Sequence, residues 1–454
     1  MRVIRCGMRR SWIALGVGLP LAVAGLYALS RRGAPAGDAG TPTIAKLFAS
    51  GAAAPAPASL AGLDITNISM ADNVATAPLP NKRTARLTLD TNLQNAALGV
   101  LESHHIPEAA VVLMDVETGR VLVYANHVEE GSPRDLCAEA TAPSASVFKI
   151  ITGSALLEAG VTPSHKECYS GGEQRIHTRD LVSDPKRDRW CTTLTGAMGR
   201  SINTIFARLA LRHLKPKGLE GTARTLGYGA PLPFDLPVQP SGLKIPEDSL
   251  GFARTSAGFW NTTLSPIHAA WLSATIARGG EPVRPVLVSD VVSSSGKVEH
   301  TATVGVSQKR VLKPEVAKSL TEMLDDTVLE GTSYRAFHDG RGKAFLPGVS
   351  VAGKTGTLSN ASAKRHYTWF TGFAPSHPYM PPQSADGAAP MVNAPRQVAV
   401  AVLVVNKPTW QVKANVVARE VLRAYFAGYN LPGVSPPSAR RVSDRRDPPT
   451  AKNR

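Results

Sequence analysis

Three short motifs contain residue types that could together perform serine-based acyl transfer. They occur in the order Ser146-Val147-Phe148-Lys149, Ser201-Ile202-Asn203 and Lys354-Thr355-Gly356. A serine hydroxyl is a poor nucleophile near neutral pH and needs a base within hydrogen-bond reach. On a helix, a lysine three residues after a serine lies about one turn away on the same face. A second serine with an asparagine could relay a proton and bind an amide, and the later lysine could bind an anionic substrate.

The first motif needs support from its surroundings because Ser-x-x-Lys is a common pattern. After Ser146, apolar residues follow at helical spacing, which predicts a helix over 146–159 with the serine at its N-terminus. Ser-x-Asn and Lys-Thr-Gly each occur once, so the signal is specific as an ordered set. Three further Ser-x-x-Lys matches lie in polar or Pro/Gly/Ser-rich stretches without the helical pattern: Ser183 to Lys186, Ser241 to Lys244 and Ser294 to Lys297.

The elements expected to position these motifs are strands near both ends of a region, with helices between them. Residues 87–101 begin as a short strand and turn helical after Asp90 or Thr91, and residues 109–124 have the pattern of a hairpin. Because hairpins need no crossover helices, the sequence predicts an α/β (α+β) fold with an antiparallel sheet flanked by helices and a helical subdomain. Further helices are expected at 194–211, 266–277, 314–329 and 411–426, and further strands at 348–353, 367–373 and 397–405.

The positive charge of the chain is concentrated at its ends. The 454 residues carry a formal net charge of +16, to which residues 1–32 contribute +6 and residues 440–454 contribute +4. Such basic ends favour anionic surfaces, such as lipid or wall polymer, over the recognition of a base sequence. No nucleic-acid-binding module is visible in the sequence, so we expect no nucleic-acid partner.

The N-terminal residues have the composition of a membrane anchor. Residues 11–30 contain no charge, and a helix of that length, at about 1.5 Å per residue, would cross a bilayer core of about 30 Å. A cleaved signal peptide is the alternative, although the apolar run is long and no small-x-small site closes it. The resulting division is a cytoplasmic 1–10, a transmembrane 11–30, an Ala/Pro/Gly-rich linker 31–84, a domain 85–428 and a disordered basic tail 429–454. We expect a protein that crosses the cytoplasmic (inner) membrane once, with the domain in the periplasm or on the outer face of that membrane.

The cysteines allow a disulfide on the exported side. Cys6 would be cytoplasmic, which leaves Cys137, Cys168 and Cys191 where a disulfide could persist. Cys168 and Cys191 flank a polar excursion, and a bond between them would close its base. The other pairings and three free buried thiols remain alternatives. No Cys/His spacing suits a metal, and we expect no cofactor.

The sequence resembles the transpeptidase domain of penicillin-binding proteins, which belong to the serine acyltransferases that include β-lactamases. The resemblance covers residues 85–428 and extends beyond the three motifs. His268 stands where the family commonly has Gln, and Ser256-Ala-Gly258 replaces a more glycine-rich stretch. The further matching segments are the domain entry at 87–94, the first hairpin at 112–122, the central helix at 264–269 with 277–280, and a late strand at 369–375.

The resemblance implies a peptidoglycan D,D-transpeptidase inhibited by β-lactams, with stem peptides as substrates and other cell-wall synthesis proteins as candidate partners. Ser146 would attack the carbonyl of the penultimate D-alanine, and Lys149 would take the serine proton. The remaining candidates are Ser201 for the proton to the leaving group, Asn203 for the substrate amide, Lys354 with Thr355 for the terminal carboxylate, Gly356 as a further substrate-binding residue, and the N–H groups of Ser146 and Thr357 for the oxyanion.

Other functions also have some support in the sequence. Gly348-Val-Ser-Val-Ala-Gly353-Lys354-Thr355 matches a phosphate-binding loop, but Val349 and Val351 alternate as in a strand and no helix pattern follows. A β-lactamase is a second alternative, because Glu247 could correspond to the glutamate that deacylates the acyl-enzyme in some β-lactamases. A D,D-carboxypeptidase passes the acyl group to water, and the sequence does not decide between water and an amine. A non-catalytic penicillin-binding sensor is a further alternative.

Overall fold

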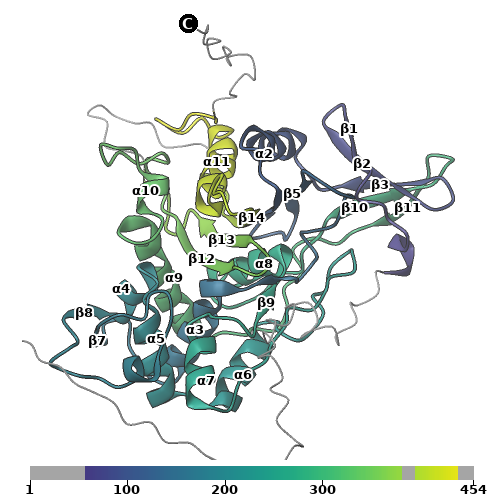
Figure 1. The fold of residues 1–454 in the computed structure, drawn as a ribbon. Helices are drawn as coiled ribbons and strands as arrows, with labels where there is room; N and C mark the ends of the chain where they lie inside the picture. Colours follow the sequence, from purple (N-terminus) through teal and green to yellow (C-terminus); the bar gives the residue numbers. More distant parts are fainter. Residues whose placement is uncertain (1–56, 381–393, 438–454) are drawn as a thin grey trace, which may run out of the picture. The chain divides into compact units, whose positions relative to one another are not determined.

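A computed structural model describes residues 57–380 and 394–437 of the chain. The expected segments 1–10 and 11–30, part of the expected linker and most of the expected tail lie outside these residues. Among the described helices, none is both long and apolar enough to cross a membrane. The described part contains two five-stranded antiparallel sheets. Helices pack against one of them (Figure 1).

The central sheet carries most of the core, and its strands have the order β12-β13-β14-β4-β5. The middle strand β14 is buried along its whole length, because successive side chains point alternately into two hydrophobic cores. Ala401, for example, belongs to one core and Val402 to the other. The five strands are β4 (Glu108–Asp115), β5 (Val121–Val128), β12 (Ala352–Asn360), β13 (Arg365–Ala374) and β14 (Val398–Asn406).

Helices cover both faces of this sheet (Figure 1). On one face, α8 (Pro266–Ala277) packs against β4, β13 and β14 and also contacts α9, so nearly all of its residues are buried. On the other face, α2 (Thr91–Ser103) and α11 (Ala414–Ala427) pack against each other and against the sheet. Asp90 caps α2 by accepting hydrogen bonds from two N–H groups of its first turn.

A helical region on the α8 side delivers the first motif to the edge of the sheet. Helix α3 contacts α5, α6 and α9, while the short 3-10 helix η2 that precedes it contacts β12 and β13. Side chains from this region and from one face of the sheet form a single hydrophobic core. The helices are η2 (Ala145–Phe148), α3 (Lys149–Glu158), α4 (Leu194–Gly199), α5 (Asn203–His213), α6 (Pro216–Thr225), α7 (Ser249–Ser256) and α9 (Pro314–Leu329).

The second sheet corrects the expected domain boundary. Residues 69–84, assigned to the linker from their composition, instead form β1, β2 and the start of β3. Half of their apolar positions are alanines, such as the buried Ala75 and Ala77, which give a weak strand signal. The order is β1-β2-β3-β10-β11, with β1 (Ser69–Ala71), β2 (Val74–Leu79), β3 (Arg83–Leu87), β10 (Val288–Val292) and β11 (Val298–Thr301).

The structure confirms the predicted fold class, the hairpin within 109–124 and the helices at 266–277 and 314–329, and it corrects three other expectations. The helix expected over 194–211 is broken between α4 and α5, where Ser201 has a φ of +58°. The strand expected at 348–353 begins later, at Ala352. The tail expected from residue 429 still packs against the fold at its start, because Leu431 is buried beside α11.

Candidate active site

Ser146 lies in η2, a single turn that continues directly into α3. The segment before it is tied to the sheet, because the Trp369 indole N–H donates to the Pro143 carbonyl at 2.9 Å. Ala145 has a φ of +48°, so the chain turns sharply just before the serine. The Ser146 side chain is only partly buried, which leaves its hydroxyl within reach of a substrate.

Lys149 is fully buried and its amine is held by three oxygens. Its Nζ lies 2.8 Å from Ser146 Oγ and 2.7 Å from Asn203 Oδ1, and it also donates to the Ala257 carbonyl. Burial, together with the charge of Lys354, holds the pKa of Lys149 well below its usual 10.5. A neutral amine has two N–H groups and one lone pair. Because the amide and backbone oxygens can only accept, the lone pair is left for the Ser146 O–H.

Asn203 is the first residue of α5, and Ser201 occupies the turn between α4 and α5. The Nδ2 group of Asn203 donates to the carbonyls of Gly172 at 3.2 Å and Glu173 at 2.8 Å. Both of its N–H groups are therefore used, and the expected contact with a substrate amide requires one of these bonds to be exchanged. Ser201 is partly buried, and within the described residues its hydroxyl makes no hydrogen bond.

Residues 354–357 lie inside β12, which is the edge strand of the sheet and contacts η2. A Cβ on Gly356 would lie 3.2 Å from the Cβ of Ala145, so glycine permits this close approach to the nucleophile turn. Lys354 is fully buried, and burial lowers its pKa to about 7. A nearby anion would favour the charged ammonium and raise this pKa.

Hydroxyl groups stand beside Lys354 on the same strand. Thr355 is partly buried, and its Oγ1 lies 2.6 Å from Oγ1 of Thr332, which also donates to the Gly199 carbonyl at 3.3 Å. Thr357 is exposed. A lysine and two threonine hydroxyls in this order can bind a carboxylate by charge-assisted hydrogen bonds.

The structure thus brings part of the predicted set together by direct contact. Ser146, Lys149 and Asn203 form one hydrogen-bonded group, and Lys354 acts on Lys149 through its charge. Ser201 and Thr357 adjoin this group along the chain, without a hydrogen bond to it in the described structure.

Two alternatives lose support. A phosphate-binding loop needs a helix after Lys354 and Thr355, but both residues lie inside a strand that pairs with β13. The β-lactamase alternative rested on Glu247, which is exposed, and the neighbouring Asp248 caps α7 by accepting from the Gly251 N–H.

Within residues 57–380 and 394–437, no cluster of His, Cys, Asp and Glu could hold a metal ion.

Sequence reasoning missed the groups that hold the motifs in place. The acceptors on Lys149 and Asn203 include backbone carbonyls, which every residue type carries, so no sequence signal identifies them. Gly258 has a φ of +86°, and a Cβ there would lie 2.4 Å from the Ala145 carbonyl oxygen. Its glycine was the one visible signal that the backbone passes close to the nucleophile turn.

A disulfide closes a loop beside this site. Cys168 and Cys191 are bonded and lie opposite each other in a two-stranded sheet. The strands are β7 (Lys166–Tyr169) and β8 (Trp190–Thr193). Cys137 is a free and buried thiol.

The fold and the contact between a buried lysine and a serine hydroxyl are those expected of a serine acyltransferase. The family model of the penicillin binding protein transpeptidase domain matches residues 109–380, more than half of the chain. The chain belongs to this family, which confirms the resemblance seen in the sequence.

The chain is similar to the peptidoglycan D,D-transpeptidase PbpA of Mycobacterium tuberculosis, with 31% identity over 246 residues that make up 52% of this chain and 48% of PbpA. It is also similar to the probable peptidoglycan D,D-transpeptidase PbpC of Pseudomonas aeruginosa, with 26% identity over 313 residues, 64% of this chain and 51% of PbpC. The chain therefore spans about half the length of these curated relatives.

Solved structures share the fold. Penicillin-binding protein A of M. tuberculosis, solved as an imipenem acyl-enzyme complex, aligns with a TM-score of 0.59 and 25% identity over 75% of this chain and 79% of that chain. A peptidoglycan glycosyltransferase from Burkholderia ambifaria aligns with a TM-score of 0.55 and 22% identity, over 77% of this chain and 99% of that one.

Proposed function

We propose that the protein is a peptidoglycan D,D-transpeptidase that cross-links stem peptides through an acyl-enzyme on Ser146. The observation that carries this proposal is the contact between Ser146 Oγ and the buried amine of Lys149, whose lowered pKa favours the neutral form that can act as a base. Membership of the penicillin-binding family and similarity to enzymes named as D,D-transpeptidases support the substrate class.

In the first step, Ser146 Oγ forms a bond to the carbonyl carbon of the penultimate D-alanine while its proton passes to Lys149 Nζ. The bond from that carbon to the nitrogen of the last D-alanine then breaks, and the leaving nitrogen receives a proton by way of Ser201. In the second step, an amine from a neighbouring stem peptide attacks the ester carbon and releases Ser146. The amine loses a proton and the serine oxygen regains one, so no redox partner or cofactor is needed.

The residues of β12 are suited to the terminal carboxylate of the substrate. Lys354 supplies a cation, and Thr355 supplies a hydroxyl that can donate to the carboxylate by exchanging its contact with Thr332. The N–H groups of Ser146 and Thr357 are the proposed oxyanion donors, each typically worth about 2.7–4 kcal/mol of transition-state stabilisation. The carboxylate contacts also account for inhibition by β-lactams that carry an equivalent carboxylate.

Labelling with a fluorescent penicillin tests the nucleophile. We expect the protein to be labelled at Ser146 and Ser146→Ala to lose the label, while the variant keeps its thermal unfolding transition. Undiminished labelling of Ser146→Ala would overturn the site assignment.

A second assay decides what resolves the acyl-enzyme. A D-Ala-D-Ala stem peptide is supplied as donor with an amine acceptor, and the products are separated by mass. A cross-linked product supports the transpeptidase, whereas hydrolysed donor alone would identify a D,D-carboxypeptidase. Stable acyl-enzyme without turnover would identify a penicillin-binding sensor.

We also propose that residues 11–30 anchor the protein in the cytoplasmic membrane with residues 85–428 outside it. The uncharged composition of this segment and the arginines before it support the proposal. Extraction of the full chain from membranes by carbonate, without detergent, would contradict it.

A further inference from the structure

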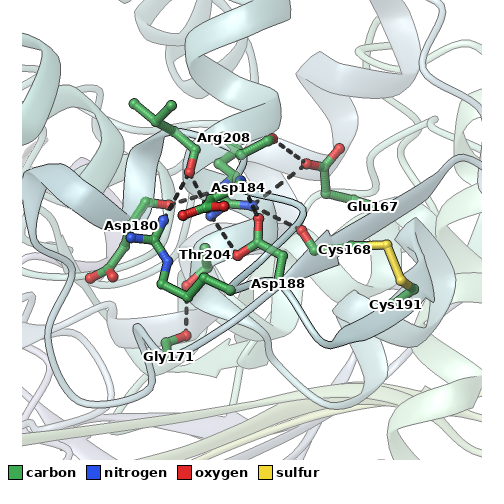
Figure 2. A network of polar contacts seen from close by, with 12 residues as sticks. Glu167, Cys168, Gly171, Asp180, Asp184, Asp188, Cys191, Thr204 and Arg208 are labelled. Atoms are coloured by element: carbon green, nitrogen blue, oxygen red, sulfur yellow. Dashed lines mark hydrogen bonds and ion pairs between the residues drawn. A yellow bond between two sulfur atoms is a disulfide. The ribbon is translucent and has the colours of Figure 1, made fainter.

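The loop closed by the Cys168–Cys191 disulfide packs against the helix that begins with Asn203 (Figure 2). We propose that this loop, residues 168–191, is the positioning element for the base of the site. Its backbone carbonyls fix the Asn203 amide, which in turn leaves the lone pair of Lys149 for Ser146. The inference rests on the proposed function, because it concerns the same nucleophile.

Arg208 on α5 anchors the loop from inside. Its side chain is 1% exposed, and its five N–H groups make five hydrogen bonds, all to acceptors between Cys168 and Asp188. Nε donates to Asp180 O at 2.7 Å, Nη1 to Cys168 O at 2.9 Å and Nη2 to Val182 O at 3.0 Å, while Asp188 accepts from both Nη atoms. Figure 2 shows this network around the guanidinium. Moving the loop would leave buried donors unpaired, which is costly.

The same loop is joined to the first turn of α5. Thr204 Oγ1 donates to the Gly171 carbonyl at 2.7 Å, and Asn203 Nδ2 donates to the carbonyls of Gly172 and Glu173. Gly172 has a φ of +79°, and a Cβ there would fall 2.0 Å from Thr204 Oγ1. Glycine at this position therefore allows the loop backbone to reach the asparagine.

The two loop carbonyls decide which end of the Asn203 amide faces Lys149. Carbonyl oxygens only accept, so the NH₂ end must face the loop and Oδ1 must face the lysine. In the reversed orientation, Oδ1 would meet two other oxygens, and an N–H would compete for the lysine lone pair. The loop therefore makes Asn203 an acceptor and leaves the lone pair of Lys149 for the Ser146 proton.

The loop also supports the second acceptor on Lys149. Ile176 is fully buried and belongs to a small apolar cluster that includes Ala257, whose carbonyl accepts from Lys149. Arg254 of α7 holds this part of the loop by donating to the Ile176 carbonyl from Nε at 3.0 Å and from Nη2 at 2.8 Å. The loop 168–191 therefore contacts both residues whose oxygens accept from Lys149, Asn203 and Ala257.

The groups around Lys149 predict the direction in which its pKa changes when the loop no longer orients Asn203. Helix α5 presents Asn203 and the ring of Phe206 at 5.7 Å, the end of α7 presents the Ala257 carbonyl, and β12 presents Lys354, the charged group that acts on it in the described structure. An acceptor oxygen stabilises the ammonium more than the amine, so losing the Asn203 oxygen lowers the pKa of Lys149 further.

The test is the pH dependence of Ser146 acylation by a labelled penicillin. We compare the wild type with the double variant Cys168→Ser/Cys191→Ser and with Gly172→Ala. Arg224→Met is the control, because it removes a surface arginine that pairs with Glu220 on α6, outside the loop. We expect the loop variants to lower the plateau rate constant roughly 10–100-fold and to move the acid-side midpoint to lower pH, with Arg224→Met unchanged.

Reduction of the wild-type disulfide after folding provides a second measurement that does not depend on the folding of the variants. Thiol titration confirms complete reduction, and we expect the same changes in rate constant and midpoint. An unchanged rate constant and midpoint in the reduced protein would overturn the inference. A smaller labelled fraction with both quantities unchanged would overturn it as well, because partial unfolding alone gives that result. A wild-type protein that is not labelled at Ser146 would instead refute the proposed function.

Discussion

Gly258 tests how the nucleophile turn is held by backbone contacts. It directly follows Ala257, the C-cap residue of α7, and has a φ of +86°. A Cβ at this position would lie 2.4 Å from the carbonyl oxygen of Ala145 and 2.9 Å from Cα of Ser146. The substitution Gly258→Ala therefore pushes directly on the turn that presents the serine, without removing any functional group.

Two effects set the size of the expected change in Gly258→Ala. An alanine in the left-handed conformation costs about 1–2 kcal/mol of folding free energy. The contact with the Ala145 carbonyl is also about 1 Å shorter than the 3.4 Å at which ordinary contact begins, so the turn must move by about that distance. A displacement of about 1 Å at a reacting group can lower the rate about 10²-fold. We expect an acylation rate constant reduced on the order of 10²-fold.

The assay is the time course of labelling by a fluorescent penicillin, with the rate constant taken from the labelled fraction alone. Gly221→Ala is the matched control, since Gly221 lies inside α6 with no atom within 4 Å of the added methyl position. It should stabilise the protein by about 0.5–1 kcal/mol and leave acylation unchanged. If Gly258→Ala is folded and acylates at the wild-type rate, the reasoning from backbone contact is refuted.

Three further predictions concern the carboxylate side of the site. Burial lowers the pKa of Lys354 to about 7, so the folded protein binds fewer protons than the unfolded chain between about pH 7 and 10.5. The free energy of unfolding should rise with pH across that window, and Lys354→Met should flatten the rise in a urea series; equal slopes would contradict this. Because the same ammonium is lost above about pH 7, the second-order rate constant for acylation by a penicillin should fall above that pH, and a constant value from pH 7 to 9 would count against the carboxylate role. Finally, Thr332→Val should lower this rate constant about 2–10-fold by removing the partner of Thr355, while Thr332→Ser should retain it; equal losses would exclude a role for the hydroxyl.

Local patterns were sufficient to predict the elements whose signals lie within one segment. The helices at 266–277 and 314–329 were found from apolar periodicity, and the hairpin within 109–124 from its turn residues. Strands β1 and β2 were missed because alanines give a weak strand signal, and the pairing of β3 with β10 was missed because β10 lies far away in the sequence. The break between α4 and α5 was missed because the left-handed conformation of Ser201 contradicts the helical pattern around it.

The candidate site shows the same division between sequence and structure. Ser146 and Lys149 could be paired from their spacing on one helix, and the order of the three motifs indicated the class of chemistry. The partners of Lys149 beyond Ser146 come from α5 and from the end of α7, and the carbonyls that orient Asn203 come from the disulfide loop. Backbone acceptors carry no residue identity, so only the folded arrangement reveals them.

What the sequence by itself determined was the set of atoms able to attack, donate or accept, because these are properties of residue types. What only the tertiary structure decided was the protonation state of these groups and the direction of their hydrogen bonds. Lys149 is buried beside Lys354, which lowers its pKa, and its two N–H groups are taken by oxygens from separate helices. Desolvation and the direction of a hydrogen bond depend on which segments meet in space, so neither can be derived from the order of residues along the chain.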